Sequence, residues 1–396
     1  MNCTSVYNEA NNLLELFLNK KINNYSKLRN YDYGKDDPNK VVSGLSRYIS
    51  HGIIKEKDIL VAIKKNRHKS DKFKQEILWR TYWKGWLEHH RDLWEKYKKT
   101  LKQEKIEISK SKKNEIYLKA ISGDTFLKPF NYWTEQLINT GYLHNHARMW
   151  YASIWIHYFS LPWVLGANFF YENLLDSDSA SNTLSWRWVA GLHSKGKKYI
   201  AFKENIKKYT FDRFKNFKLP DLNNVILNEN EICKNETNFK KASVFENKKK
   251  ICLFVFENNL NLNFLLENNN FISEIILLKF NNTEIKQSIR VSNFKNKCCE
   301  DFYQLVKNKN IKINKFIIQD EISYLIKHLK TNKISEICYE FIPTGYEKDS
   351  FSLVKRKLVK ENILLKETLD LFYFNAWKYC SRGYFNFKKN FIEFSD

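Results

Sequence analysis

The hydrophobic periodicity of the chain changes near residue 249, and this change limits the folds open to it. From residue 1 to about 215 apolar residues recur with a helical period, as in "FKQEILWRTYWKGWLEHHRDLWEKYKK". From residue 249 onward, short β-rich runs such as "ICLFVFE" and "EIILLKF" alternate with helical runs such as "EISYLIKHLK". Such alternation favours a parallel α/β sheet. The sequence therefore predicts a multi-domain α and α/β protein, with an all-helical domain at 1–215 followed by a smaller, Rossmann-like α/β domain at 249–396.

The segment between these two domains has a different composition. Residues 216–248 are rich in Asn, Lys and Glu and have only weak periodicity. We expect them to form a linker or an irregular connection.

The net charge favours an acidic partner. Lys and Arg number 67 against 44 Asp and Glu, which gives a formal charge of +23. Such an excess is typical of proteins that bind nucleic acid or an anionic membrane. Lys and Asn are abundant along the whole chain, however, so a biased composition explains the charge equally well.

The cysteines and the apolar runs exclude several classes of protein. Of the seven cysteines only Cys3 precedes Cys233, and there is no C-x-x-C, so the first half cannot form a four-cysteine metal or iron–sulfur site. No G-x-G-x-x-G or P-loop motif occurs. The N-terminus lacks a basic leader with an apolar core, and no apolar run reaches the roughly 18 residues of a membrane span. We therefore expect free thiols, no metal, and a soluble, cytoplasmic monomer.

Two short segments carry candidate binding residues. In "KVVSGLSRYISHG", the small residues Ser43–Ser46 precede an amphipathic run, where free N–H groups can bind phosphate oxygens or form an ordinary N-cap. In "YLHNHARMWYAS", Arg148 follows Asn145 by three residues and could pair with Asp176 or Asp178. A purely structural salt bridge explains this second pattern equally well.

Tryptophan is concentrated in the first half of the chain. All but one of the eleven tryptophans precede residue 215, several of them separated by basic residues. Burial in the core is the default explanation. Aromatic side chains between basic residues also stack nucleic-acid bases, and closely spaced indoles can carry electrons to a redox cofactor.

Residues 27–215 resemble the flavin-binding catalytic half of the DNA photolyase/cryptochrome superfamily. The resemblance depends on five blocks in the order typical of that superfamily: "YDYGKDDP", "VSGLSRYISHG", "QEILWRTYW", "TGYLHNHARM" and "LLDSDSASNTLSWRWVAG". It implies a bound, U-shaped FAD. The positions that match its binding residues are Tyr31, Ser43, Gly44, Leu45, Ser46, Arg80, Asn145, Arg148, Met149, Asp176, Ser177, Asp178 and Asn182.

The resemblance also implies residues for catalysis and for DNA. Asn182 matches the residue that faces flavin N5, and Trp186 and Trp163 match the first two members of a photoreduction chain. A flipped-out cyclobutane pyrimidine dimer would contact the residues at five matching positions. These are Glu76, Trp79, Asn145, His146 and Trp188.

Several positions depart from the pattern of the superfamily. His146 stands where photolyases have an arginine that contacts the lesion, and Ile121 aligns with the third tryptophan of the chain, for which Trp133 or Trp155 could substitute. Further departures are Lys35, Val42 and Gly44. Enzymes that repair the pyrimidine–pyrimidone photoproduct carry a pair of histidines at the positions of Asn145 and Met149. Their absence argues against that second repair chemistry.

The C-terminal region resembles a displaced antenna domain. Superfamily members begin with an α/β antenna domain, whereas here "ICLFVFENNLNLN", at residue 251, faintly resembles the start of that domain. We therefore expect a circularly permuted arrangement. Whether a folate or a deazaflavin binds there as an antenna chromophore stays open.

The resemblance implies a blue-light-dependent deoxyribodipyrimidine photo-lyase, a carbon–carbon lyase that repairs DNA containing pyrimidine dimers by electron transfer from excited, reduced FAD. The alternative is a cryptochrome-like photoreceptor that binds FAD and signals without repairing DNA. A flavoprotein without photochemistry is a third option. Glu76 together with Trp188 favours repair, because a receptor has no need of either side chain.

Overall fold

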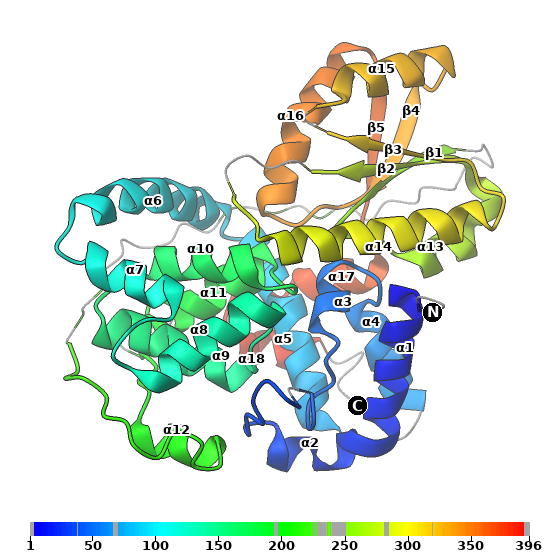
Figure 1. Ribbon diagram of the computed structural model, residues 1–396. Coiled ribbons are helices and arrows are strands. Elements are labelled where there is room, and N and C mark those ends of the chain that lie inside the picture. Colours follow the sequence, from blue (N-terminus) through cyan, green and yellow to red (C-terminus); the bar gives the residue numbers. More distant parts are fainter. Residues whose placement is uncertain are drawn as a thin grey trace.

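The computed structural model describes residues 4–37, 39–65, 70–193, 197–223, 251–280, 285–318 and 320–391, together with a few single residues between 225 and 239. The first half of this described chain is helical, as predicted (Figure 1). Its elements, in which η1 and η2 are π-helical turns, are α1 (Val6–Leu16), η1 (Phe17–Lys21), α2 (Ile22–Leu28), α3 (Ser46–Ser50), α4 (Glu56–Lys65), α5 (Asp71–Glu88), α6 (Arg91–Lys110), α7 (Asn114–Ser122), α8 (Lys128–Thr140), α9 (Asn145–Ser153), η2 (Ile154–Tyr158), α10 (Trp163–Asn173), α11 (Ser179–Val189) and α12 (Lys203–Tyr209).

Strands and helices alternate from residue 251 onward. The elements are β1 (Ile251–Phe256), α13 (Leu262–Asn268), the short 3₁₀ turn η3 (Asn269–Phe271), β2 (Ile272–Lys279), α14 (Ile289–Lys307), β3 (Ile313–Ile317), α15 (Ile322–Thr331), β4 (Glu336–Glu340), α16 (Tyr346–Lys360), β5 (Leu364–Thr368), α17 (Leu371–Trp377) and α18 (Tyr384–Asn390). The strands form one sheet of order β3-β2-β1-β4-β5, in which every neighbouring pair is parallel. This order is that of doubly wound α/β folds. The predicted parallel α/β sheet is confirmed.

The two faces of the sheet belong to different cores. On β1, Cys252, Phe254 and Phe256 pack into the smaller core, to which α15 and α16 contribute. Leu253 and Val255 point to the opposite face and join the large core, which continues through α14 into the helical half. In Figure 1, α14 lies between the sheet and the helical half, with α15 and α16 on the far side of the sheet. One continuous core therefore joins the two halves.

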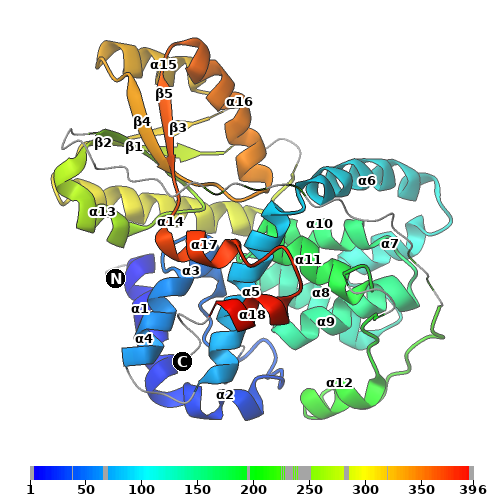
Figure 2. The ribbon, with the colours of Figure 1, turned by 180° about the vertical axis from the view of Figure 1, so that it is seen from behind.

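The last two helices return to the helical half. Helices α17 and α18 contact α5, and Figure 2 shows both lying against it. The buried Trp377 donates a hydrogen bond from Nε1 to the carbonyl of Thr81, at 3.1 Å. A Cβ atom added to Gly85 would lie 2.8 Å from Cys380 Sγ, so glycine permits this close approach of α5 to the segment after α17. The last strand of the sheet ends at residue 368, and the two helices after it pack on the helical half. That residues 249–396 form a displaced antenna domain stays a prediction.

Most of the expected connection at 216–248 lies outside the described residues. In the described ranges, five cysteines are free and buried: Cys252, Cys298, Cys299, Cys338 and Cys380. The same ranges contain no group of three His, Cys, Asp or Glu side chains placed to bind a metal ion. None of the described helices has the length and apolar character needed to cross a bilayer.

Candidate functional site

A large cavity lies within the helical half. Its volume is about 670 Å³, and α5, α9, α11 and the segment 42–49 provide most of its lining. All of the predicted site residues line it except Tyr31 and Trp163. Tyr31 instead stacks on Phe211, with 5.0 Å between the ring centroids, and Trp163 contacts Tyr97 at 5.7 Å.

A buried ion pair forms one side of the cavity. Arg148 Nη2 lies 3.0 Å from Asp176 Oδ2 and 3.1 Å from Oδ1, and Arg148 Nε donates to the Leu143 carbonyl at 2.9 Å. Burial of Asp176 raises its pKa, but the Arg148 guanidinium, the Ser46 hydroxyl and the Arg80 guanidinium outweigh burial and hold the pKa below its usual value. Of the two aspartates expected as partners of Arg148, Asp176 forms the pair.

Asp178 has a different role from Asp176. Its Oδ1 accepts the backbone N–H of Ser181 at 2.6 Å and so caps the N-terminus of α11. Its other oxygen lies 3.9 Å from Lys84 Nζ. Helix α11 is thereby fixed at the end from which Asn182 projects, and Asn182 Nδ2 in turn donates to the Ala167 carbonyl at 2.8 Å.

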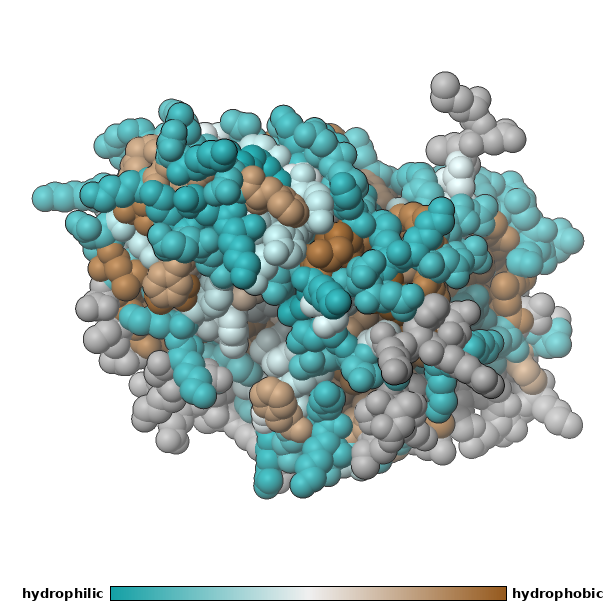
Figure 3. All heavy atoms as spheres, turned by 90° about the horizontal axis from the view of Figure 1, so that it is seen from below, coloured by the Kyte–Doolittle hydropathy of each residue, from teal (hydrophilic) through white to brown (hydrophobic). Residues whose placement is uncertain are grey.

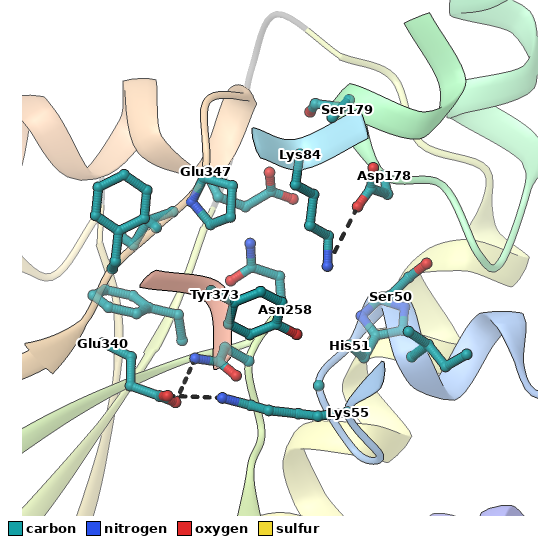
Figure 4. A pocket seen from close by; sticks show the side chains of 18 of the residues that line it. Ser50, His51, Lys55, Lys84, Asp178, Ser179, Asn258, Glu340, Glu347 and Tyr373 are labelled. Carbon is teal, nitrogen blue, oxygen red and sulfur yellow. Dashed lines mark hydrogen bonds and ion pairs between the residues drawn. The ribbon is translucent and has the colours of Figure 1, made fainter. Parts of the chain in front are cut away.

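A second, smaller cavity of about 90 Å³ lies at the junction of the helical half with the sheet (Figure 4). Lys55 Nζ reaches across this junction to Glu340 Oε1 at 2.7 Å. Lys84 lies between Asp178 and Glu56. This cavity is too small for a dinucleotide, and its Lys55–Glu340 ion pair joins the two halves.

Comparison with known proteins identifies the helical half. The profile of the family described as the FAD binding domain of DNA photolyase matches residues 73–225. These residues belong to that family. A deoxyribodipyrimidine photo-lyase of Agrobacterium fabrum is 32% identical over 171 residues, which are 41% of this chain and 35% of that protein. A cryptochrome DASH of Idiomarina loihiensis is 32% identical over 136 residues, which are 34% of this chain and 29% of that protein.

Solved structures are similar as well. One of them is a bacterial class III photolyase from Agrobacterium tumefaciens, with a TM-score of 0.44 and 23% identity over 52% of this chain and 43% of that chain. The chain spans less than half the length of each of these relatives.

The cavity of this photolyase FAD-binding domain fits its cofactor. Three buried polar atoms of residues in its lining, Arg80 Nε, His144 Nε2 and Ser181 Oγ, have no hydrogen-bond partner among the described residues. Buried polar groups are normally paired, so a polar ligand would satisfy them. Gly44, with φ of 71°, allows the tight turn that places Ser43–Ser46 along the cavity. Its volume lies within the ~300–1,000 Å³ typical of cofactor sites. FAD is therefore the cofactor of this domain.

The residues predicted to face a lesion line the same cavity and come from α5, α9 and α11. Trp188 is 36% exposed and stacks on Tyr199 at 5.6 Å. Trp79 is stacked on Tyr384 of α18, with 3.6 Å between centroids and 9° between planes. Asn145, the first residue of α9, is exposed. Tyr384 was not predicted as a site residue, because no motif marks the helix from which it comes.

The carboxylate of Glu76 is paired. Glu76 Oε1 lies 2.8 Å from Arg29 Nη1 and 3.4 Å from Lys72 Nζ, and all three side chains line the cavity. Arg29 was not among the predicted site residues. It lies within the range of the resemblance but two positions before the first matching block, "YDYGKDDP", so no block marked it.

The aromatic residues behind the cavity form two groups. Trp186 is buried and contacts Phe170 at 5.0 Å and Trp155 at 6.2 Å, edge to face in both cases. Trp163 lies beside the Arg187 guanidinium, 5.8 Å from its ring centroid. The roles of Trp186 and Trp163 in electron transfer stay predictions.

Proposed function

We propose that the protein is a light-dependent enzyme that splits cyclobutane pyrimidine dimers in DNA, with FAD as its photochemical cofactor. The observation that carries the proposal is that Glu76, Trp79 and Trp188 line the same cavity as the FAD-binding residues. A base flipped into this cavity would therefore lie next to the cofactor. A protein whose cofactor only senses light does not need the Glu76 carboxylate or the exposed Trp188 indole in this cavity.

The side chains of this cavity have distinct tasks in the proposed reaction. When bound, reduced and excited by light, FAD supplies the electron that splits the dimer. The Glu76 carboxylate would accept hydrogen bonds from the N–H groups of the flipped bases. Trp188, partly exposed, would stack on them, and Trp79 would close the pocket on the side of α18. The Asn182 amide, fixed by its bond to Ala167, would orient the edge of the cofactor.

Charge would bring the DNA to the cavity. The formal charge of +23 gives a sequence-independent attraction to phosphates that weakens with salt. Figure 3 shows a face covered mainly by hydrophilic side chains, with smaller hydrophobic areas between them. Both features suit a surface that meets a polyanion and also stacks bases.

The test is an illuminated repair assay with FAD-loaded, photoreduced protein and an oligothymidine that carries cyclobutane dimers. Recovery of thymine absorbance should require blue light and should fall at least ten-fold in Glu76→Ala. Glu115→Ala is the matched control, because Glu115 lies on α7 with a side chain that is 77% exposed. Dimers that persist under illumination in the wild-type protein would refute the proposal.

The second candidate is a photoreceptor that binds FAD without repairing DNA. The observation that favours it is His146, which stands at the position of a lesion-contacting arginine. In the assay above, photoreduction of FAD without loss of dimers would support this candidate.

A further inference from the structure

The residue at position 146 cannot supply a cation to DNA. The His146 ring is buried and stacks on Trp150, with 4.3 Å between centroids. Its Nδ1 lies 2.9 Å from the Asn30 carbonyl and its Nε2 lies 3.5 Å from the Tyr199 hydroxyl. Burial lowers the pKa of His146, so the ring is neutral at pH 7. The positive charge that photolyases carry at this position is absent here.

A cation from another element lies close by. Arg29 precedes Asn30, whose carbonyl contacts His146, and it caps the C-terminus of α2. Its guanidinium lies 2.8 Å from Glu76 Oε1, and the residue lines the cavity with a side chain that is 21% exposed. The chain therefore has a permanent positive charge beside the predicted lesion-binding carboxylate, supplied from the end of α2 and not from α9.

The guanidinium has more donors than this ion pair uses. Arginine carries five N–H donors, and it binds phosphate in a bidentate fashion. If Arg29 turned toward a phosphate, Glu76 would keep Lys72, at 3.4 Å, as a compensating cation. Glu76 would then be free to accept hydrogen bonds from the bases without being left as an unpaired carboxylate.

We propose that Arg29 binds a phosphate of the damaged strand and takes over the task that an arginine at position 146 performs in photolyases. The inference rests on the proposed function. It assigns the phosphate-binding cation of the lesion site to the end of α2 instead of α9. Without DNA, Arg29 pairs with Glu76, and in the bound state it pairs with a phosphate of the strand instead.

The test compares Arg29→Gln, Arg29→Lys and Lys27→Gln with the wild-type protein. Lys27 is exposed on the same helix and is absent from the cavity lining, so Lys27→Gln removes the same charge without touching the site. The dissociation constant for a single-stranded oligothymidine with one dimer is measured over a salt series. One phosphate contact contributes about 0.7 to the slope of log affinity against log salt for a single strand.

Arg29→Gln should lower this slope by about 0.7 and weaken binding about ten-fold, a loss typical of one hydrogen bond to a charged group. Arg29→Lys should keep the slope, and Lys27→Gln should keep the wild-type preference for the dimer. Photoreduction of FAD without DNA should be equal in all four proteins. An unchanged slope in Arg29→Gln, with a normal wild-type preference for the dimer, would overturn this inference alone. A wild-type protein with no such preference would overturn the proposed function as well.

Discussion

Gly166 offers the sharpest test of the packing behind the cofactor cavity. It lies inside α10, where glycine is less favourable than alanine by about 1 kcal/mol. A Cβ atom at this position would lie 2.5 Å from Trp186 Cζ3 and 3.0 Å from Trp155 Cε2. Trp155 is 0% exposed and does not line the cavity, so Trp186, which does, is the ring that must give way. Gly166→Ala should therefore displace Trp186 from its place beside the cavity.

The expected magnitude follows from two opposing terms. Overpacking a filled core costs about 1–3 kcal/mol, and the better helix propensity of alanine returns about 1 kcal/mol. Gly166→Ala should thus fail to stabilise the chain and should lower the free energy of unfolding by up to about 2 kcal/mol, although helix propensity alone predicts a gain. Urea unfolding of the FAD-free chain measures this change, and the rate of FAD photoreduction in the loaded protein should fall with it.

A double-mutant cycle with Trp186→Phe separates the clash from other effects. The smaller ring leaves room for the new methyl group, so Gly166→Ala should cost about 1 kcal/mol less in the Trp186→Phe background. If Gly166→Ala instead stabilises the wild-type chain by about 1 kcal/mol, the close approach of α10 to Trp186 is wrong, and with it the reason for glycine at this position.

Three further predictions concern the ion pair, the buried histidines and the last helix. Asp176→Asn removes the partner of Arg148, whose side chain is 23% exposed, and should cost about 2–3 kcal/mol in urea unfolding; a cost below about 0.5 kcal/mol would contradict the argument that this pair is buried. Burial lowers the pKa of His51 and of His193 to about 4. Between pH 6.5 and 4 the unfolded chain therefore binds more protons than the folded one. The free energy of unfolding should fall as the pH is lowered through this range, by up to about 1.4 kcal/mol per pH unit for each histidine. Unfolding curves that are identical at pH 7 and pH 5 would argue against this. Tyr384→Ala, but not Tyr384→Phe, should weaken binding of dimer-containing DNA several-fold while FAD binding is kept; equal DNA affinity in both variants would show that the ring of Tyr384 does not position the site.

Much of the fold was predictable because it depends on local periodicity. Strand β1 lies within the predicted run "ICLFVFE", and β2 overlaps the run "EIILLKF" but begins two residues before it, since buried parallel strands need short apolar segments and the helices between them need a different period. The Arg148–Asp176 pair was predictable for a similar reason, because the charged residues stand out in an apolar surrounding.

Contacts between distant segments were not predictable in this way. Tyr384 and Trp79 stack closely, yet the helix of Tyr384 follows the whole α/β sheet in the chain. Arg29 forms an ion pair with Glu76 because α2 and α5 pack together, and no local sequence pattern around either residue predicts this pair. Such pairs arise from tertiary packing, which periodicity does not encode.

The aromatic residues behind the cavity show the same limit most clearly. The sequence left Trp133 and Trp155 as equal substitutes for the missing third tryptophan. In the structure Trp133 stacks on Trp150, at 5.5 Å, whereas Trp155 lies 6.2 Å from Trp186 and 6.0 Å from Tyr117, a half-buried ring nearer to solvent. Continuous ring contact therefore leads from Trp186 through Trp155 to Tyr117. Ring contact with Trp186 favours Trp155 over Trp133 as a relay, and the part of either ring in electron transfer stays a prediction.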